Sequence, residues 1–184
     1  MLEFVDLPDS HEDEYAFARH YIDMLLERFT AYRPKVVCWD DPGYMHLAED
    51  EIRVILTKPR GKRTVEIIIV PSTRPGGVDC GYAFMDVENS PLKHRTEASF
   101  LPFDLLLVHL EAIFQNQICA VIARNNAGEI LSSELAWTAD VPLGRPKRLL
   151  YQTPDDPNGF MVSLCFVREI QIAFWSEKDR LYHY

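Results

Sequence analysis

Hydrophobic and polar residues alternate most regularly in two neighbouring segments, 51–57 and 64–70, which predict a β-hairpin. If Thr57 pairs with Thr64 across the residues between them, one face of the hairpin is entirely apolar. That face carries Ile52, Val54, Leu56, Val65, Ile67 and Ile69. The opposite face is mixed and carries Arg53, Ile55, Thr57, Thr64, Glu66 and Ile68. The pattern therefore predicts the register of the hairpin and the face that packs in the core.

Apolar residues spaced three and four positions apart predict two helices. The first begins near the N-cap residues Asp9 and Ser10 and ends near Tyr32, because Pro34 disfavours helical geometry in the residue before it. Its apolar stripe consists of Ala18, Tyr21, Ile22, Leu25, Leu26 and Phe29. The second helix covers 103–118 and is apolar on most sides, so we expect it to be largely buried. Its narrow polar stripe contains Asp104, Glu111 and Gln115.

Shorter apolar runs predict the remaining strands. They cover 36–39, 82–87, 119–124, 129–137, 148–152 and 160–167, with a last strand that contains Ile170, Ile172 and Phe174. The segment 119–124 would also fit an extension of the second helix. We prefer a strand, because the turn sequence Asn125-Asn126-Ala127-Gly128 follows it. Residues 89–96 are polar and predict a connection without regular structure.

This order of elements predicts an α+β fold: a mostly antiparallel sheet built from hairpins, with two main helices packed on one face. A doubly wound parallel sheet is the weaker alternative, because strands and helices do not alternate regularly. With 184 residues, 47% of them hydrophobic and 26% charged, the chain is typical of a single globular domain over 1–184.

The sequence also bears on location. No apolar run reaches the roughly 20 residues that a membrane span needs, and the acidic N-terminus lacks the basic stretch of a secretory signal. The four cysteines, Cys38, Cys80, Cys119 and Cys165, are widely separated in apolar surroundings. They predict buried free thiols rather than a metal site, with a disulfide as the less favoured alternative. We therefore expect a cytoplasmic protein that does not bind membranes.

The net charge of −9 comes from one part of the chain. Residues 1–51 contain 13 acidic and 4 basic residues, whereas 52–184 contain 15 of each. Two acidic clusters close this part, with an aromatic residue and a histidine between them. The sequence predicts a partner-binding site made of Asp40, Asp41, Tyr44, His46, Glu49, Asp50 and Glu51. The alternative is that these acids only solvate a loop and the start of a strand.

Other motifs give little support for nucleic-acid binding, metal binding or nucleophilic catalysis. The hairpin tip, 58–63, has four positive charges, but it has no interleaved aromatic residues, so we expect no nucleic-acid binding. No pair of histidines has metal-ligand spacing, and His109 fits the interior of the second helix. Ser90 and Lys93 match S-x-x-K without its companion motifs, and Cys80 has no histidine fixed beside it. The sequence predicts no metal and no cofactor.

We interpret the chain as a non-enzymatic binding module whose acidic N-terminal third meets a basic protein partner. Immunity proteins, antitoxins and secretion chaperones work in this manner. A small hydrolase or transferase with a dispersed site is one alternative, with Asp40, Asp41, His46 and Glu49 as contributors. A structural subunit of a larger assembly is another. The sequence leaves the oligomeric state open, a homo-oligomer included.

Overall fold

The computed structural model describes residues 16–38, 51–59, 63–72, 77–86, 94–141, 149–151, 160–162, 167–176 and 178–183. The chain divides into two compact units. The first contains Met1–His94 with Phe100–Leu106, and the second contains Arg95–Ser99 with Leu107–Tyr184. The single globular domain expected over 1–184 stays a prediction.

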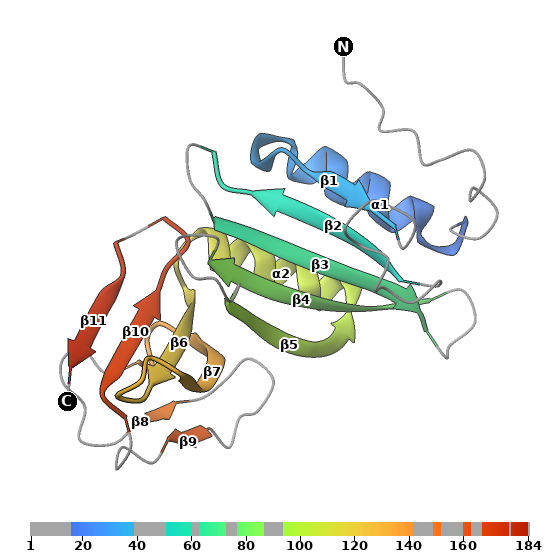
Figure 1. Cartoon of the computed structure of the whole chain (residues 1–184). Coiled ribbons are helices and arrows are strands. Elements are labelled where there is room, and N and C mark those ends of the chain that lie inside the picture. Colours follow the sequence, from blue (N-terminus) through green and yellow to red (C-terminus); the bar gives the residue numbers. More distant parts are fainter. Residues whose placement is uncertain are drawn as a thin grey trace. The chain divides into compact units, whose positions relative to one another are not determined.

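A five-stranded sheet dominates the first half of the chain (Figure 1). Its strands follow one another in chain order: β1 (Lys35–Val37), β2 (Ile52–Thr57), β3 (Arg63–Pro71), β4 (Val78–Asp86) and β5 (His94–Pro102). Neighbouring strands with a described register are antiparallel. The predicted α+β class is confirmed, and the strands are distributed over three sheets rather than one.

The predicted hairpin forms β2 and β3 of this sheet. Thr57 lies opposite Thr64, and Val54 lies opposite Ile67, as the alternation predicts. All six apolar side chains of the proposed inner face are 0% exposed. The hydrophobic pattern therefore excludes a shift by one residue, which would turn six buried side chains to the other face.

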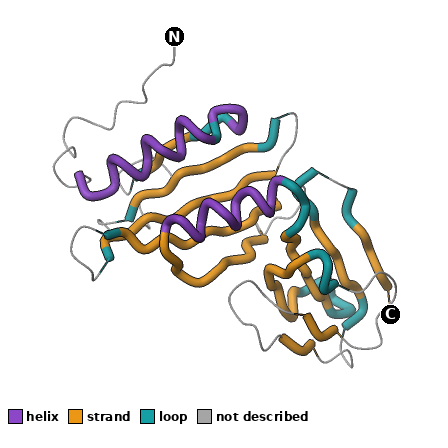
Figure 2. The backbone as a smooth tube through the Cα atoms, turned by 180° about the vertical axis from the view of Figure 1, so that it is seen from behind, coloured by secondary structure: helices purple, strands orange, loops and turns teal. Residues whose placement is uncertain are grey.

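Helix α1 (Ala16–Arg28) contacts β2 and β3 and buries Ala18, Ile22 and Leu25. Figure 2 shows it lying along the strands. Its ring of Tyr21 meets Phe103 edge-on, with the ring centroids 4.8 Å apart. The predicted N-cap residues, Asp9 and Ser10, lie outside the described residues.

The helical part of the chain ends at the predicted place. After α1, a 3-10 turn, η1 (Thr30–Tyr32), continues to the residue before Arg33. Arg33 has a φ of 48°, which takes the chain out of helical geometry directly before Pro34. The Thr30 hydroxyl donates to the carbonyl oxygen of Leu26 at 2.8 Å, so part of the helix end is capped by a side chain.

A four-stranded sheet forms the second half, in the order β11-β10-β6-β7. Its strands are β6 (Ile118–Arg124), β7 (Ile130–Trp137), β10 (Glu169–Ala173) and β11 (Arg180–His183). The strand prediction for 119–124 is thus confirmed. Its core contains Cys119, Val121, Ala123, Ala136, Val141, Val167, Ile170, Ile172 and Phe174. The expected hairpin further along pairs β8 (Leu149–Tyr151) with β9 (Phe160–Val162).

The turn between β6 and β7 is specified by its first residue. The side-chain oxygen of Asn125 accepts hydrogen bonds from the backbone N–H groups of Ala127 at 2.8 Å and Glu129 at 3.0 Å. Gly128 has a φ of 79°, a conformation that glycine adopts without strain. This turn reverses the chain between β6 and β7, so the two strands pair as an antiparallel hairpin.

Two predictions about elements are wrong. Helix α2 (Phe103–Phe114) ends four residues earlier than expected, because Asn116 adopts a left-handed φ of 59° and β6 begins at Ile118. Most of this helix is buried as expected, although Leu105 and Val108 are 45% and 54% exposed. Residues 94–96, expected to lie in a connection without regular structure, belong to β5. Strands β5 and β11 were not predicted, since their apolar and polar residues alternate too weakly.

Candidate functional site

Of the seven predicted partner-binding residues, only Glu51 belongs to the described residues. Asp40, Asp41, Tyr44, His46, Glu49 and Asp50 lie outside them. The same is true of Ser90 and Lys93, and of Arg60 and Lys62 in the basic tip. What the structure adds is the environment of Glu51 and of the two strands that flank this part of the sequence.

Glu51 is held by an ionic cluster that the sequence analysis missed. The Arg53 Nε donates to the Glu51 carboxylate at 2.5 Å, and the Arg53 Nη1 donates to the Glu66 carboxylate at 2.8 Å. Arg53 and Glu66 share a face of the β2–β3 pair as diagonal neighbours, because Ile55 lies opposite Glu66 and Ile68 lies opposite Arg53. We call Glu51, Arg53 and Glu66 the carboxylate–guanidinium triad.

The side chains of the triad are almost completely excluded from water. The side chains of Arg53 and Glu66 are 8% and 6% exposed, and that of Glu51 is 16% exposed. Burial alone would lower the pKa of the Arg53 guanidinium, but its hydrogen bonds to Glu66 and Glu51 outweigh burial and raise it. Arg53 therefore remains charged at any physiological pH. With both carboxylates ionised, the triad carries a net charge of −1.

Strands β1 and β2, which flank the acidic clusters in the sequence, pair with each other. Val37 lies opposite Arg53 in this antiparallel pair. The buried Cys38 directly follows Val37, and Glu51 precedes Ile52 at the start of β2. Paired strands are about 5 Å apart, and consecutive Cα atoms are 3.8 Å apart. The register therefore pairs the strand that precedes residues 39–50 with the strand that follows them.

The acidic surplus of residues 1–51 can be assigned to two segments of this region. The described residues 16–38 contain four basic residues, Arg19, Arg28, Arg33 and Lys35, and two acidic ones, Asp23 and Glu27. The acidic surplus therefore belongs to the flanking segments. Residues 1–15 contain six acids and no Lys or Arg, and residues 39–51 contain five acids and no Lys or Arg. We call residues 39–51 the acidic segment.

The cysteines that the structure describes are buried thiols, as predicted. Cys38, Cys80 and Cys119 are free and buried, and Cys165 lies outside the described residues. Burial, assisted by the Asp79 carboxylate, raises the pKa of Cys80 to about 12. Burial also raises the pKa of Cys119 to about 11, although a hydrogen bond to Thr138 and the charge of Arg180 oppose it. Both thiols stay protonated at neutral pH, which argues against a nucleophilic Cys80.

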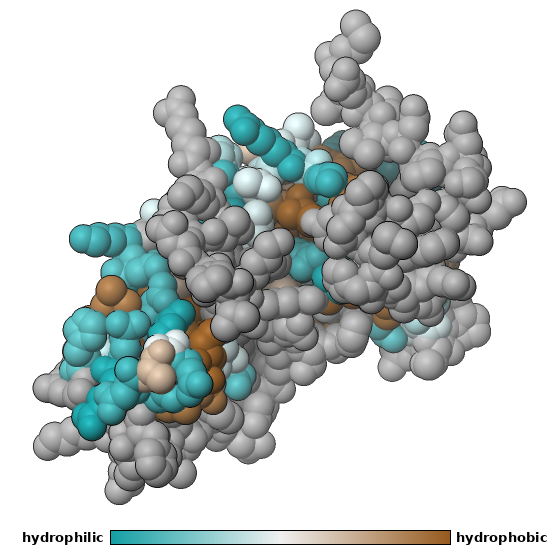
Figure 3. All heavy atoms as spheres, viewed as in Figure 1, coloured by the Kyte–Doolittle hydropathy of each residue, from teal (hydrophilic) through white to brown (hydrophobic). Residues whose placement is uncertain are grey.

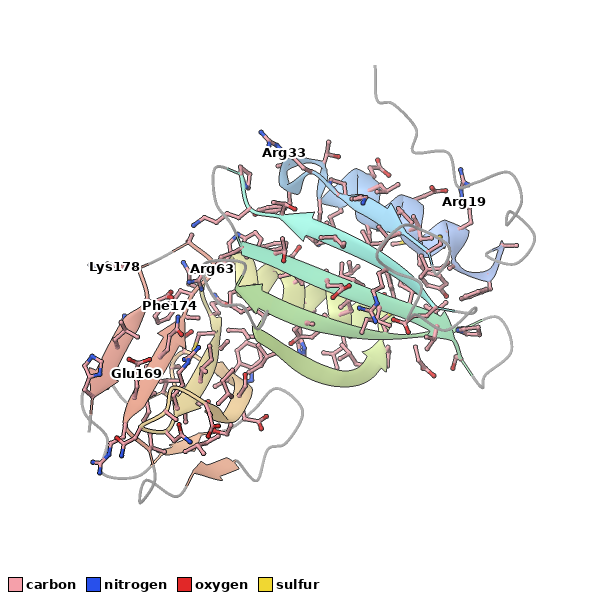
Figure 4. The ribbon with its side chains drawn as sticks, in the orientation of Figure 1. Arg19, Arg33, Arg63, Glu169, Phe174 and Lys178 are labelled. Carbon is pink, nitrogen blue, oxygen red and sulfur yellow. The ribbon has the colours of Figure 1, made fainter. Side chains whose placement is uncertain are left out.

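A second ionic cluster lies on the four-stranded sheet. Glu169 is opposite Arg124 on one side and opposite His183 on the other. Its carboxylate lies 3.9 Å from the Arg124 Nη1 and 3.6 Å from the His183 Nδ1. Arg124 also donates to the Gln171 side chain at 3.1 Å. Figure 4 labels Glu169 on β10, and Figure 3 shows hydrophilic atoms over β10 and β11.

This second cluster is more exposed than the triad. The side chains of Arg124 and Glu169 are 19% and 31% exposed, and that of His183 is 72% exposed. His109, in contrast, is buried as expected, and its ring meets Trp137 edge-on at 6.0 Å. Within the described ranges, no three His, Cys, Asp or Glu side chains are grouped so as to hold a metal ion.

Comparison of the chain with protein-family models, with curated proteins and with solved structures gave no match. In the part of the chain that the structure describes, no helix is both long enough and apolar enough to cross a membrane. The candidate site is therefore defined by this chain alone. It consists of the acidic segment, the β1–β2 pair that flanks it in the sequence, and the triad at its C-terminal end.

Proposed function

We propose that the chain is a cytoplasmic, non-enzymatic binding module whose acidic segment contacts a basic surface of a partner protein. Immunity proteins, antitoxins and secretion chaperones are the class we have in mind. The observation that supports this proposal is the composition of the acidic segment, which contains five acids and no Lys or Arg. The strands before and after residues 39–50 are paired, with Val37 opposite Arg53.

Electrostatics supports this arrangement. A segment with five acids and no Lys or Arg attracts a positive surface through its net negative charge. Like charges near each other repel, so a cluster of this kind is stabilised when a basic partner neutralises it. Glu51 does not take part directly, because Arg53 already binds it. We therefore remove Glu51 from the partner-contacting set and keep Asp40, Asp41, Tyr44, His46, Glu49 and Asp50.

Affinity capture from a lysate of the native host tests the proposal with three baits. The first is the wild-type chain. The second reverses the acidic segment and carries Asp40→Lys, Asp41→Lys, Glu49→Lys and Asp50→Lys. The third is the matched control, with four reversals in the basic tip: Lys58→Glu, Arg60→Glu, Lys62→Glu and Arg63→Glu.

We expect a basic protein that the wild-type and basic-tip baits retain and the acidic-segment bait loses. Thermal melting of each bait checks that the reversals leave the chain folded. A partner that the acidic-segment bait retains and the basic-tip bait loses would refute the proposal and assign binding to the hairpin tip.

A further inference from the structure

The alternation of apolar residues leaves one ambiguity in the pairing of β2 with β3. A shift by one residue turns every side chain to the other face, whereas a shift by two residues keeps each side chain on its own face. One such shift would place Val54 opposite Ile69 instead of Ile67. Leu56 would then lie opposite Ile67. We call this pairing the shifted register. Its facing side chains are still aliphatic, so the hydrophobic pattern does not distinguish it from the observed register.

A two-residue shift in the opposite direction is disfavoured by the aliphatic face itself. It would place Leu56 opposite Arg63. The Leu56 side chain is completely buried, and Arg63 is half-buried at the start of β3. Drawing a charged side chain onto an apolar face costs free energy. Only the shifted register therefore needs a second determinant that excludes it.

The hydrogen bond between Arg53 and Glu66 distinguishes the observed register from the shifted one. In the observed register the two residues are diagonal neighbours, and the Arg53 Nη1 donates to the Glu66 carboxylate at 2.8 Å. In the shifted register Arg53 would lie opposite Val70, which is four residues from Glu66 along β3. At about 3.3 Å per residue, this moves the two residues about 13 Å apart along the strand, too far for the bond to form. The bond from Arg53 to Glu51 would survive, because both residues move together.

Burial makes the loss of this bond costly. Both side chains are almost fully excluded from water, so solvent replaces little of what the shifted register breaks. Well-packed apolar side chains of similar volume often stabilise a fold as well as a buried ion pair does. Fixing the register of neighbouring elements is the best-established use of a buried polar contact.

We propose that the Arg53–Glu66 bond is the register determinant of the five-stranded sheet: it selects the observed pairing of β2 with β3 over the shifted register that the aliphatic face tolerates. It fixes β1 as well, because β1 pairs with β2 and moves with it. The inference is independent of the proposed function, since it concerns only strands that the structure describes.

Two engineered cysteine pairs in the full chain report the two registers. Thr57→Cys with Thr64→Cys reports the observed register, because opposite residues lie about 5 Å apart, a Cα separation that a disulfide spans. Ile55→Cys with Ile68→Cys reports the shifted register, in which these residues would be opposite. In the observed register they are diagonal neighbours, roughly 7–8 Å apart, and do not crosslink without backbone movement. Mass spectrometry of the digested chain after mild oxidation measures the crosslinked fraction.

Each cysteine pair is placed in three backgrounds: the unchanged chain, Arg53→Met/Glu66→Met, and the matched control Arg124→Met/Glu169→Met. The control removes the same two residue types from the more exposed cluster of the four-stranded sheet. In the Arg53→Met/Glu66→Met background we expect the shifted-register crosslink to rise at least about tenfold and the observed-register crosslink to fall. In the control background both crosslinks should equal those of the unchanged chain.

Thermal melting shows whether each background folds. If Arg53→Met/Glu66→Met does not fold, Arg53→Gln/Glu66→Gln makes the same test with nearly the original shapes and no charge, and a smaller rise of the same crosslink is expected.

Two results would overturn the inference. An unchanged shifted-register crosslink in the folded background would assign the register to the aliphatic face and to the turn, where the Lys58 N–H donates to the Arg63 carbonyl oxygen at 2.9 Å. Loss of both crosslinks would show that the strands separate instead of exchanging register.

Discussion

One face of the β2–β3 pair is fully buried and the other is partly buried, and different chemistry stabilises them. One face presents six aliphatic side chains that are 0% exposed. The other buries Arg53 and Glu66, which are 7% and 4% exposed as whole residues. The aliphatic face is stabilised by removing apolar surface from water. The ionic face is tolerated only because each charge has a partner, so loss of one charge leaves another without compensation.

A similar set of residues on the four-stranded sheet is arranged differently. There Arg124 lies 3.9 Å from Glu169, and both side chains are more exposed than those of the triad. Water screens that pair, so it contributes little to stability. The comparison shows that burial and distance, and not residue type, decide the importance of an arginine–carboxylate pair.

The largest effect should come from a charge on the aliphatic face. Ile67→Asp would bury a carboxylate without a partner, and we expect the free energy of unfolding to fall by about 4 kcal/mol or more. Thermal unfolding measures this change. Thr57→Asp, on the half-buried end of the other face, is the control and should cost much less. A melting temperature of Ile67→Asp within about 2 °C of wild type would contradict the face assignment.

Breaking the triad should have the next largest effect. Arg53→Met removes the guanidinium that binds the buried Glu66 carboxylate, and we expect a loss of about 3–5 kcal/mol in urea unfolding. The double variant Arg53→Met/Glu66→Met removes both charges and should recover most of that loss. If the single variant were as stable as wild type, the triad would not be buried as described. If the double variant were no more stable than the single one, unpaired charge would not be the cause of the loss.

A smaller effect should appear at alkaline pH through Cys80. The pKa of this thiol is about 9 in an unfolded chain and about 12 in the folded protein, so folding favours the protonated form. Its contribution to stability is complete below about pH 9 and is lost as the pH rises toward 12. We expect Cys80→Ala to lose less stability than wild type between pH 8 and pH 10.5, in urea titrations at about these two values. An equally steep loss in both proteins would show that Cys80 ionises normally.

The smallest effect should come from the exposed cluster. Arg124→Met removes the cation beside Glu169, yet we expect a change in unfolding free energy of at most about 1 kcal/mol. The change should shrink further at high salt, since water and ions screen the pair. A loss as large as that of Arg53→Met would remove the contrast between the two ionic clusters.

Much of the fold could be predicted because its signals are local. The β2–β3 register follows from alternation within two short segments, and β6 follows from the turn that begins at Asn125. Strands β5 and β11 could not be predicted in this way, because they are identified by pairing with neighbours and not by their own pattern. The early end of α2 depends on the left-handed Asn116, which the apolar composition of the following residues conceals.

The site was predicted less completely. The clustering of acids is visible in the sequence, but it does not show that Glu51 is bound internally by Arg53. A signal for the triad was present: once Thr57 pairs with Thr64, Arg53 and Glu66 become diagonal neighbours of opposite charge on one face. Their burial, however, depends on what covers that face, which alternation within two strands does not reveal.

The most direct test of the account is the salt dependence of association between the chain and its captured basic partner. For the wild-type chain, the association rate should fall steeply as ionic strength rises from about 0.01 M to about 0.15 M, because the screening length shortens from about 30 Å to about 8 Å. The variant with Asp40, Asp41, Glu49 and Asp50 reversed should associate much more slowly at low salt, and its rate should not fall as salt rises. A variant that associates at the wild-type rate, with the wild-type salt dependence, would show that the acidic segment does not recognise the partner.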